Sequence, residues 1–239
     1  MKYLENSVLE VLSSALSNSA FDCILDFKLE SYSCKMVQSD KKEWKTFDTS
    51  VSWSERQPLS PPDEFLSLNA SPIGHAARLR HMSERSCSES DNDGEDNSLV
   101  DSISRRTLFD LVRVLNSAYP DYDFRNVKSD CFSLVSSFEQ VVSLVNGKLA
   151  TTVFNYCTQR DELWNAVEEG ITPNECRIFS FKSPYVDDPF SEDGCIWSLN
   201  FFFYNKTLKR LLFLSCRCLS KVSENIFDPA WEDEVEQPE

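Results

Sequence analysis

Two runs of aromatic and branched side chains near the C-terminal end restrict the fold of this chain most strongly. They lie within residues 194–219 and flank the dipeptide Asn205-Lys206. A polar pair between two such runs is typical of a β-hairpin. In the simplest register Tyr204 faces Thr207 across a two-residue turn. A three-residue loop is the alternative, because Lys206 stands where such turns usually have Gly.

Side chains alternate between the two faces of such a hairpin. One face collects residues that are apolar except for Arg210 near the tip: Cys195, Trp197, Leu199, Phe201, Phe203, Leu208, Arg210, Leu212, Leu214 and Cys216. The other face is mixed, because it pairs Ser198 with Phe213 and Asn200 with Leu211. A shift by one residue would carry Ser and Asn into the core. Strands of about ten residues span roughly 33 Å, so we expect this hairpin at the centre of a sheet.

Apolar periodicity predicts the other elements. It indicates helices over residues 3–17, 107–118, 132–155 and 158–170, and strands over 21–36, 43–47 and 176–181. Thr107 and Asp110 fit a capping box at the start of the second helix. Helices and strands follow one another in mixed order, with antiparallel strands at the end. We therefore expect an α/β fold, a single-domain sandwich whose mostly antiparallel sheet of four or five strands packs against helices.

The composition changes within the chain. From residue 49 to residue 102 Ser, Pro, Asn and acidic residues dominate, and apolar periodicity disappears. This pattern predicts a long disordered insert inside one domain rather than a linker between two. Residues 1–48 and 103–222 are then the two parts of that domain. Residues 223–239 are expected to form a disordered acidic tail.

The net charge of −15 argues against a broad surface for nucleic-acid phosphates and suits basic protein partners. With 41% apolar residues the chain can bury a sizeable core as a monomer. No signal peptide or membrane span is evident. Nine scattered Cys without a Cys-x-x-Cys motif indicate reduced thiols, hence the cytosol or the nucleus.

No catalytic constellation is evident. The five Gly form no phosphate-binding loop, and both His fall in the insert. An acidic turn carries Asp187, Asp188, Glu192 and Asp193. Clustered carboxylates suit hard cations, but the spacing matches no calcium loop. A solvated turn, a protein contact and a metal site therefore stay open for it.

The expected hairpin tip is locally basic, since Lys206, Lys209 and Arg210 follow one another there. Three interpretations stay open for this patch. It is a solvated surface, a contact for an acidic partner, or a nucleic-acid contact.

The insert contains patterns that protein kinases read. Ser60 and Ser71 each precede a Pro, Ser83 follows two arginines, and three further serines lie close to acid: Ser86, Ser88 and Ser90. Each phosphate adds roughly −1.5 to −2 charges, which repels an acidic or nucleic-acid-laden partner. The sequence thus predicts a phosphorylatable insert. The alternative is a spacer whose serines only keep it soluble.

Three blocks of residues carry a family resemblance. The first is Lys2-Tyr3-Leu4-Glu5-Asn6-Ser7 together with residues 30–36. The second is residues 106–116 together with Tyr119-Pro120-Asp121-Tyr122-Asp123-Phe124. The third is residues 163–167 together with Asp188-Pro189-Phe190-Ser191-Glu192-Asp193-Gly194 and Trp197-Ser198-Leu199-Asn200-Phe201-Phe202-Phe203-Tyr204-Asn205-Lys206. On these blocks the chain resembles the eukaryotic Maf family of RNA polymerase III repressors. The third block is very specific. Its one departure is Phe201, where the family usually has Tyr.

The resemblance implies a non-enzymatic negative regulator without a cofactor. Such proteins bind the core of RNA polymerase III near its clamp and contact a TFIIIB-related initiation factor. This binding blocks recruitment to the promoters of tRNA and other small RNA genes. Neither sequence-specific nucleic-acid binding nor a membrane is implied.

The resemblance also implies regulation by nutrient-sensing kinases and phosphatases, with shuttling between cytoplasm and nucleus. The target-of-rapamycin kinase is one such kinase, and the dephosphorylated form accumulates in the nucleus and represses. Ser60 matches a family phosphosite well. Ser71 matches a second one less closely because the spacing differs, and Ser83 rests on its local pattern alone.

Two hypotheses from other classes stay open. A generic acidic adaptor or chaperone for basic proteins agrees with the net charge. A metal-dependent enzyme would use the acidic turn at residues 187–193.

Overall fold

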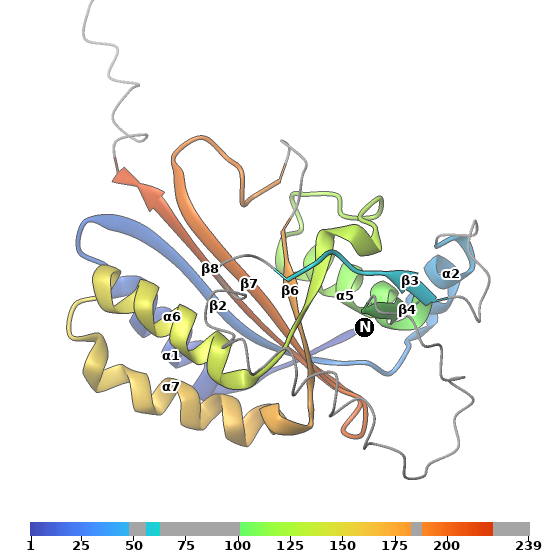
Figure 1. Ribbon diagram of the computed structural model, residues 1–239, viewed down its shortest axis with the longest axis horizontal. Coiled ribbons are helices and arrows are strands. Elements are labelled where there is room, and N and C mark those ends of the chain that lie inside the picture. Colours follow the sequence, from blue (N-terminus) through green and yellow to red (C-terminus); the bar gives the residue numbers. More distant parts are fainter. Residues whose placement is uncertain (48–55, 63–100, 183–187, 222–239) are drawn as a thin grey trace, which may run out of the picture.

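The computed structural model describes residues 1–47, 56–62, 101–182 and 188–221 (Figure 1). Its centre is a six-stranded antiparallel sheet in the order β1-β2-β8-β7-β6-β5. These strands are β1 (Lys2–Leu4), β2 (Cys23–Ser33), β5 (Phe132–Val135), β6 (Arg177–Phe181), β7 (Cys195–Asn205) and β8 (Arg210–Ser220). A separate antiparallel pair joins β3 (Arg56–Pro58) to β4 (Ser102–Ser104). The expected α/β fold with an antiparallel sheet is confirmed, with more strands than predicted.

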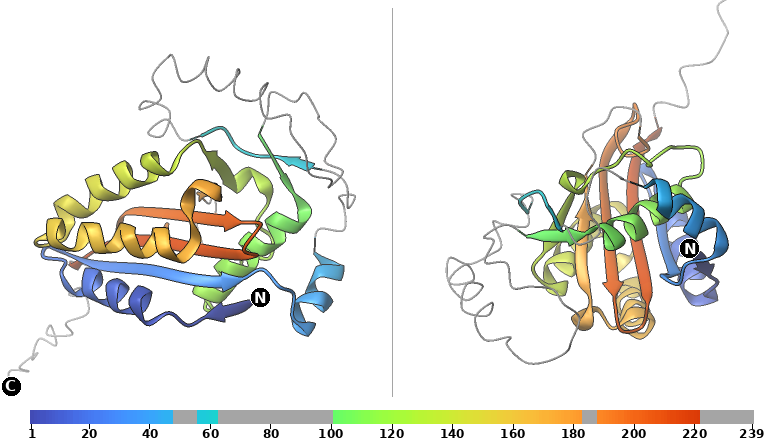
Figure 2. Two further views of the ribbon diagram at one scale, coloured as in Figure 1. Left: turned by 90° about the horizontal axis from the view of Figure 1, so that it is seen from below. Right: turned by 90° about the vertical axis from the view of Figure 1, so that its right-hand side faces the viewer.

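The described residues form five α-helices. They are α1 (Ser7–Asn18), α2 (Gln38–Thr46), α5 (Arg105–Ala118), α6 (Phe138–Thr152) and α7 (Tyr156–Ile171), with short 3₁₀ turns η1 (Ser129–Cys131) and η2 (Pro173–Glu175). Helices α1, α6 and α7 cover one face of the sheet, and α5 lies on the other (Figures 1 and 2). No helix of the described part is long and apolar enough to cross a membrane.

The sheet is therefore buried on both faces. Toward α1, α6 and α7 it presents Phe201, Phe203 and Leu214. Toward α5 it presents Phe202 and Phe213, whose rings stack with their centroids 4.6 Å apart. Alternate residues of β7 thus serve two different core halves, which explains why residues 201–203 are consecutive phenylalanines.

The predicted hairpin is present, but its register differs from the simplest prediction. Asn205 pairs with Arg210 and Tyr204 with Leu211, so residues 206–209 form the loop. Part of the reason is local. The buried Asn205 accepts a hydrogen bond at Oδ1 from Leu208 N (2.9 Å), and Lys209 adopts a left-handed φ of 52°. Because the partners move by an even number of residues, the side chains from Trp197 to Asn205 keep their predicted faces. A bulge between Cys195 and Trp197 interrupts the alternation at the start of the strand.

Several predicted boundaries are wrong. The chain begins with strand β1 rather than helix, and residues 43–47 belong largely to helix α2. The long helix expected over 132–155 is divided, because residues 132–135 pair with β6 as strand β5 before α6 begins. Tertiary pairing decides this case, since a short apolar run fits either element.

The caps of two helices also differ from the prediction. Ser104, not Thr107, caps α5, and its Oγ accepts a hydrogen bond from Thr107 N at 3.1 Å. Helix α7 starts after Asn155 rather than at Thr158. The Ser104 hydroxyl thus satisfies one of the backbone N–H groups that the first helical turn leaves without a partner. Asn155 makes no such side-chain bond and starts α7 with a left-handed φ of 53°.

Part of the segment 49–102 has regular structure. Residues 56–58 form β3, and Leu59 is buried in the core half beneath α5. The expectation of disorder therefore does not hold for residues 56–62. Ser102, at the end of the predicted insert, belongs to β4. Residues 49–55 and 63–100, with Ser71 and Ser83, lie outside the described part, as does the tail from residue 222.

Candidate partner-binding surfaces

The acidic turn before β7 is largely a structural element. Asp188 is only 4% exposed, and its Oδ1 accepts hydrogen bonds from the backbone N–H groups of Phe190 (2.8 Å) and Ser191 (2.9 Å). The Ser191 hydroxyl donates a third bond to the same oxygen at 2.8 Å. The Asp188 carboxylate thus closes the turn from inside, and a partner does not reach this group on the surface.

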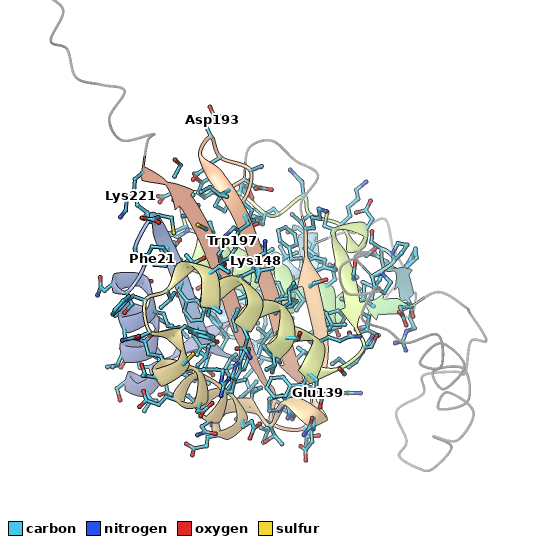
Figure 3. The ribbon with its side chains drawn as sticks, turned by 60° about the vertical axis from the view of Figure 1, so that its left-hand side comes forward. Phe21, Glu139, Lys148, Asp193, Trp197 and Lys221 are labelled. Carbon is cyan, nitrogen blue, oxygen red and sulfur yellow. The ribbon has the colours of Figure 1, made fainter. Side chains whose placement is uncertain are left out.

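Glu192 is held by Arg217 of β8. The guanidinium Nη1 lies 3.1 Å from Glu192 Oε2 and donates to the Pro189 carbonyl oxygen at 2.6 Å. Asp193, in contrast, is exposed at the end of the turn, where Figure 3 shows it projecting from one end of the sheet. Asp187 lies outside the described residues. Of the described members of this predicted site, Asp193 is the one that solvent reaches fully.

The basic tip of the hairpin is rigidly supported. The buried Asn205 donates a hydrogen bond from Nδ2 to the Ile171 carbonyl oxygen (3.0 Å), which fixes the tip to the end of α7. The Lys209 carbonyl oxygen accepts one from Cys34 N (2.9 Å), which fixes it to the end of β2. The side chains of Lys206, Lys209 and Arg210 are all exposed. A supported loop presents these cations in a constant arrangement.

The two predicted charged sites lie at opposite ends of the sheet. The acidic turn precedes the first residue of β7, and the basic tip follows its last residue. A strand of eleven residues spans about 36 Å. A partner that contacts a small area therefore cannot touch both sites at once, and we treat them as separate surfaces.

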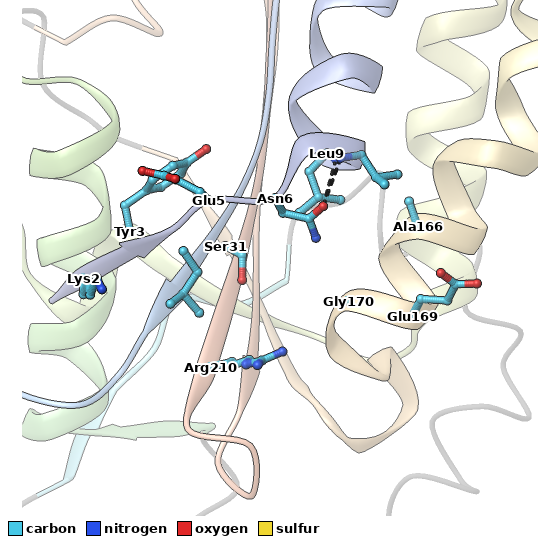
Figure 4. Close-up of a pocket in the computed structure, with 12 residues that line it drawn as sticks. Lys2, Tyr3, Glu5, Asn6, Leu9, Ser31, Ala166, Glu169, Gly170 and Arg210 are labelled. Carbon is cyan, nitrogen blue, oxygen red and sulfur yellow. Dashed lines mark hydrogen bonds between the residues drawn. The ribbon is translucent and has the colours of Figure 1, made fainter.

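A cleft opens beside the basic tip. Its volume is about 600 Å³. Four segments line it: residues 2–9 of β1 and the start of α1, Ser31 of β2, residues 166–170 near the end of α7, and Arg210 of β8 (Figure 4). Both signs of charge occur there, with Lys2 and Arg210 against Glu5 and Glu169. Sequence reasoning missed this cleft, because its lining comes from four segments that are distant along the chain.

Ser60 lies at the opposite edge of the sheet, beside β5. Its backbone N–H donates to the Phe132 carbonyl oxygen at 2.9 Å, and its hydroxyl donates to the Asp130 carbonyl oxygen. Ser133 Oγ donates to the Pro61 carbonyl oxygen at 2.9 Å. Residues 56–62, which we name the edge segment, are therefore attached to the edge of the sheet at Ser60 and Pro61.

Burial makes several thiols unreactive. It raises the pKa of Cys34 and Cys176 to about 12 and that of Cys131 to about 11. A thiol with a raised pKa is a poor nucleophile. Among the described residues, no group of three or more His, Cys, Asp or Glu is arranged to hold a metal ion.

Comparison with known proteins decides the family. Residues 25–215 match the family model described as the Maf1 regulator. The chain belongs to the Maf1 family of RNA polymerase III transcription repressors. It is thus identified as a non-enzymatic regulator, as the sequence predicts.

The relatives carry the same description. A Schizosaccharomyces pombe protein named "Repressor of RNA polymerase III transcription maf1" is 30% identical over 224 residues, which cover 92% of this chain and 84% of that protein. The "Repressor of RNA polymerase III transcription" of Dictyostelium discoideum is 31% identical over 245 residues, covering 93% and 86%. A crystal structure of citrus MAF1 has a TM-score of 0.56 at 24% identity, covering 90% of this chain and 98% of that one, which supports the Maf1 fold.

Proposed function

We propose that this chain represses RNA polymerase III by binding the polymerase core in its clamp region and a TFIIIB-related initiation factor. Binding blocks recruitment to promoters of tRNA and other small RNA genes. The main observation that supports this proposal is the match of residues 25–215 to the Maf1 regulator family model. Two separate charged surfaces at opposite ends of the sheet support it, because they allow two protein partners to be held at once.

The direct test is promoter-dependent transcription of a tRNA gene with purified RNA polymerase III and its initiation factors. We expect the unphosphorylated protein to reduce the transcript in a dose-dependent manner. Transcription by RNA polymerase II with its own factors serves as the control and stays unchanged. Undiminished tRNA synthesis in the presence of correctly folded protein would contradict the proposal.

We propose further that phosphorylation of the insert relieves repression. Ser60 supports this idea because of its position in the edge segment. A phosphoryl group removes the hydroxyl proton that Ser60 donates to the Asp130 carbonyl oxygen. It also places roughly −1.5 to −2 charges against that oxygen. Both effects weaken the attachment of the edge segment to β5, so the phosphorylated chain presents a different surface at this edge.

Nutrient-sensing kinases and opposing phosphatases are the proposed regulators, with Ser60, Ser71 and Ser83 as sites. The dephosphorylated protein then accumulates in the nucleus, and the phosphorylated protein in the cytoplasm. We expect the triple Ala variant to stay nuclear and repressive under nutrient-rich conditions. Localisation and tRNA synthesis that follow the nutrient state in this variant as in the wild type would rule out these serines.

A second candidate function is a generic acidic adaptor for basic proteins, which the net charge of −15 favours. The two functions differ in their dependence on salt. An adaptor that binds by net charge loses its partners between low and physiological ionic strength, because exposed charges are screened within about 8 Å. We expect the complex with RNA polymerase III to persist at physiological salt. The binding of histone-like basic proteins is expected to disappear.

A further inference from the structure

Lys2 and Arg210 lie in one row across the sheet, at the floor of the cleft. Lys2 of β1 pairs with Ser33 of β2, which in turn pairs with Arg210 of β8. Paired residues of adjacent strands point to the same face, and adjacent strands lie about 4.8 Å apart. The backbones of the two cationic residues are thus about 10 Å apart, with only a serine between them. This distance allows one carboxylate to contact both cations.

Neither cation forms an ion pair within the described part of the chain. Both side chains are exposed. Elsewhere in the fold, Arg106, Arg113 and Arg217 all pair with carboxylates. Lys2 and Arg210 therefore remain available for an anionic group from another molecule.

The walls of the cleft limit the size of that anion. Glu169 in the last turn of α7 and Glu5 after β1 contribute negative charge on the opposite sides (Figure 4). The C-terminal end of α7 adds partial negative charge, since the helix dipole points its negative end there. One carboxylate fits between the two cations, whereas a polyphosphate chain would meet repulsion from these walls. The overall charge of −15 disfavours nucleic acid in the same way.

The cleft continues along an edge strand. β1 is the outermost strand of the six-stranded sheet and pairs only with β2 in the described residues. An exposed edge accepts an additional strand, because its backbone N–H and C=O groups then gain partners. Lys2, Tyr3 and Leu4 of β1 also line the cleft. A segment that enters the cleft over this edge would pass Lys2 before it reaches Arg210.

We propose that this cleft binds an extended acidic segment of a protein partner that enters over the edge of β1, with a glutamate or aspartate side chain between Lys2 and Arg210. The inference deepens the proposed function, since it rests on repression through a protein partner. It specifies that the partner contributes an acidic side chain where it contacts the basic end of the molecule.

The test measures peptide binding to the full chain by fluorescence anisotropy, without polymerase. The probe is a labelled peptide of about ten residues that alternates Glu and Val, a pattern that forms a strand with one acidic face. A peptide with Gln in place of Glu is its matched control. The variants are Lys2→Gln and Arg210→Gln. Arg160→Gln, which removes a half-exposed arginine from the first half of α7, is the control for net charge.

We expect the Glu peptide to bind, and Arg210→Gln and Lys2→Gln each to weaken it by roughly tenfold, as loss of one well-placed charge contact does. Arg160→Gln changes the affinity by less than about twofold. Circular dichroism confirms that each variant is folded. The inference is overturned if Glu and Gln peptides bind alike, if Arg160→Gln weakens binding as much as Arg210→Gln, or if single-stranded DNA displaces the peptide at a lower concentration than unlabelled peptide does.

The outcome is separable from that of the transcription assay. If the protein represses tRNA synthesis but binds no Glu peptide, the proposed function stands and this inference is wrong. If the protein binds the peptide through Arg210 but leaves transcription unchanged, the proposed function is wrong and the acidic-segment site stands.

Discussion

Arg217 of β8 lies directly opposite Asp26 of β2 and holds its Oδ2 with Nε at 3.0 Å and Nη2 at 2.9 Å. The same guanidinium reaches the acidic turn through Pro189 and Glu192. It also lies 5.3 Å from the centre of the Tyr119 ring. One side chain thus connects the centre of the sheet, helix α5 and the turn that leads into β7.

Replacing this arginine by an apolar residue is expected to destabilise the fold. Arg217→Met leaves the half-buried Asp26 without its cation and releases the Pro189 carbonyl oxygen. The expected loss is about 1–3 kcal/mol of unfolding free energy, measured by urea denaturation. Arg125→Met is the control, because Arg125 is exposed and its one ion pair within the described ranges is with the nearby Asp123. An unfolding midpoint that falls equally in both variants would contradict this account.

Asp110 of α5 is expected to make stability depend on pH. Burial raises the pKa of this carboxyl group to about 7, although the adjacent Arg106 acts in the opposite direction. The folded state therefore binds the proton more tightly than the unfolded state. Its contribution to stability is fully present below about pH 4 and is lost as the pH rises toward 7.

Asp110→Asn removes this dependence, since the amide carries no titrating proton. We expect the variant to be more stable than the wild type at pH 8, by at most about 4 kcal/mol, and similar to it at pH 4. Thermal unfolding at both pH values measures the difference. A variant that is less stable at pH 8 would show that the ion pair with Arg106 outweighs the burial of the carboxylate.

Thiol reactivity is expected to follow burial. Cys157 is exposed on α7, whereas Cys216 lies in the core beneath α1 and α7, and burial raises the pKa of Cys216 well above its ordinary value. Iodoacetamide under native conditions should modify Cys157 and spare Cys216, as peptide mass spectrometry can show. In urea both thiols should react. Rapid native modification of Cys216 would mean that this core half opens readily.

The edge segment is expected to respond to the chemistry at Ser60. Ser60→Glu places a negative charge against the Asp130 carbonyl oxygen. We expect the backbone amide hydrogen of residue 60 to exchange with solvent about tenfold faster or more than in the wild type. Ser60→Ala keeps the backbone bond to Phe132 and is the control, with a smaller effect. Equal exchange in both variants would contradict a role of charge in releasing this segment.

Much of the sheet was predictable because period-two alternation is a local signal. Phe201 and Phe203 lie on one core face and Phe202 on the other, as alternation requires. The register was not predictable. It depends on Asn205, whose amide reaches the Ile171 carbonyl oxygen across a sequence distance of 34 residues.

The candidate sites show the same limit. Asp188, Glu192 and Asp193 are chemically alike in the sequence, and a partner contact was one candidate interpretation for all three. The structure buries Asp188, pairs Glu192 with Arg217 and exposes Asp193. The environment of each carboxylate depends on which groups the fold places beside it. Arg217, for example, lies 25 residues from Glu192 along the chain.

The sequence by itself determined the antiparallel sheet, the helices that cover it and the family, because these follow from local periodicity and from specific residue blocks. Only the tertiary structure decided the loop of the hairpin, the attachment of Ser60 to β5 and the cleft between Lys2 and Arg210. The physical reason is that each of these depends on contacts between distant segments. Such contacts form only when the whole chain packs.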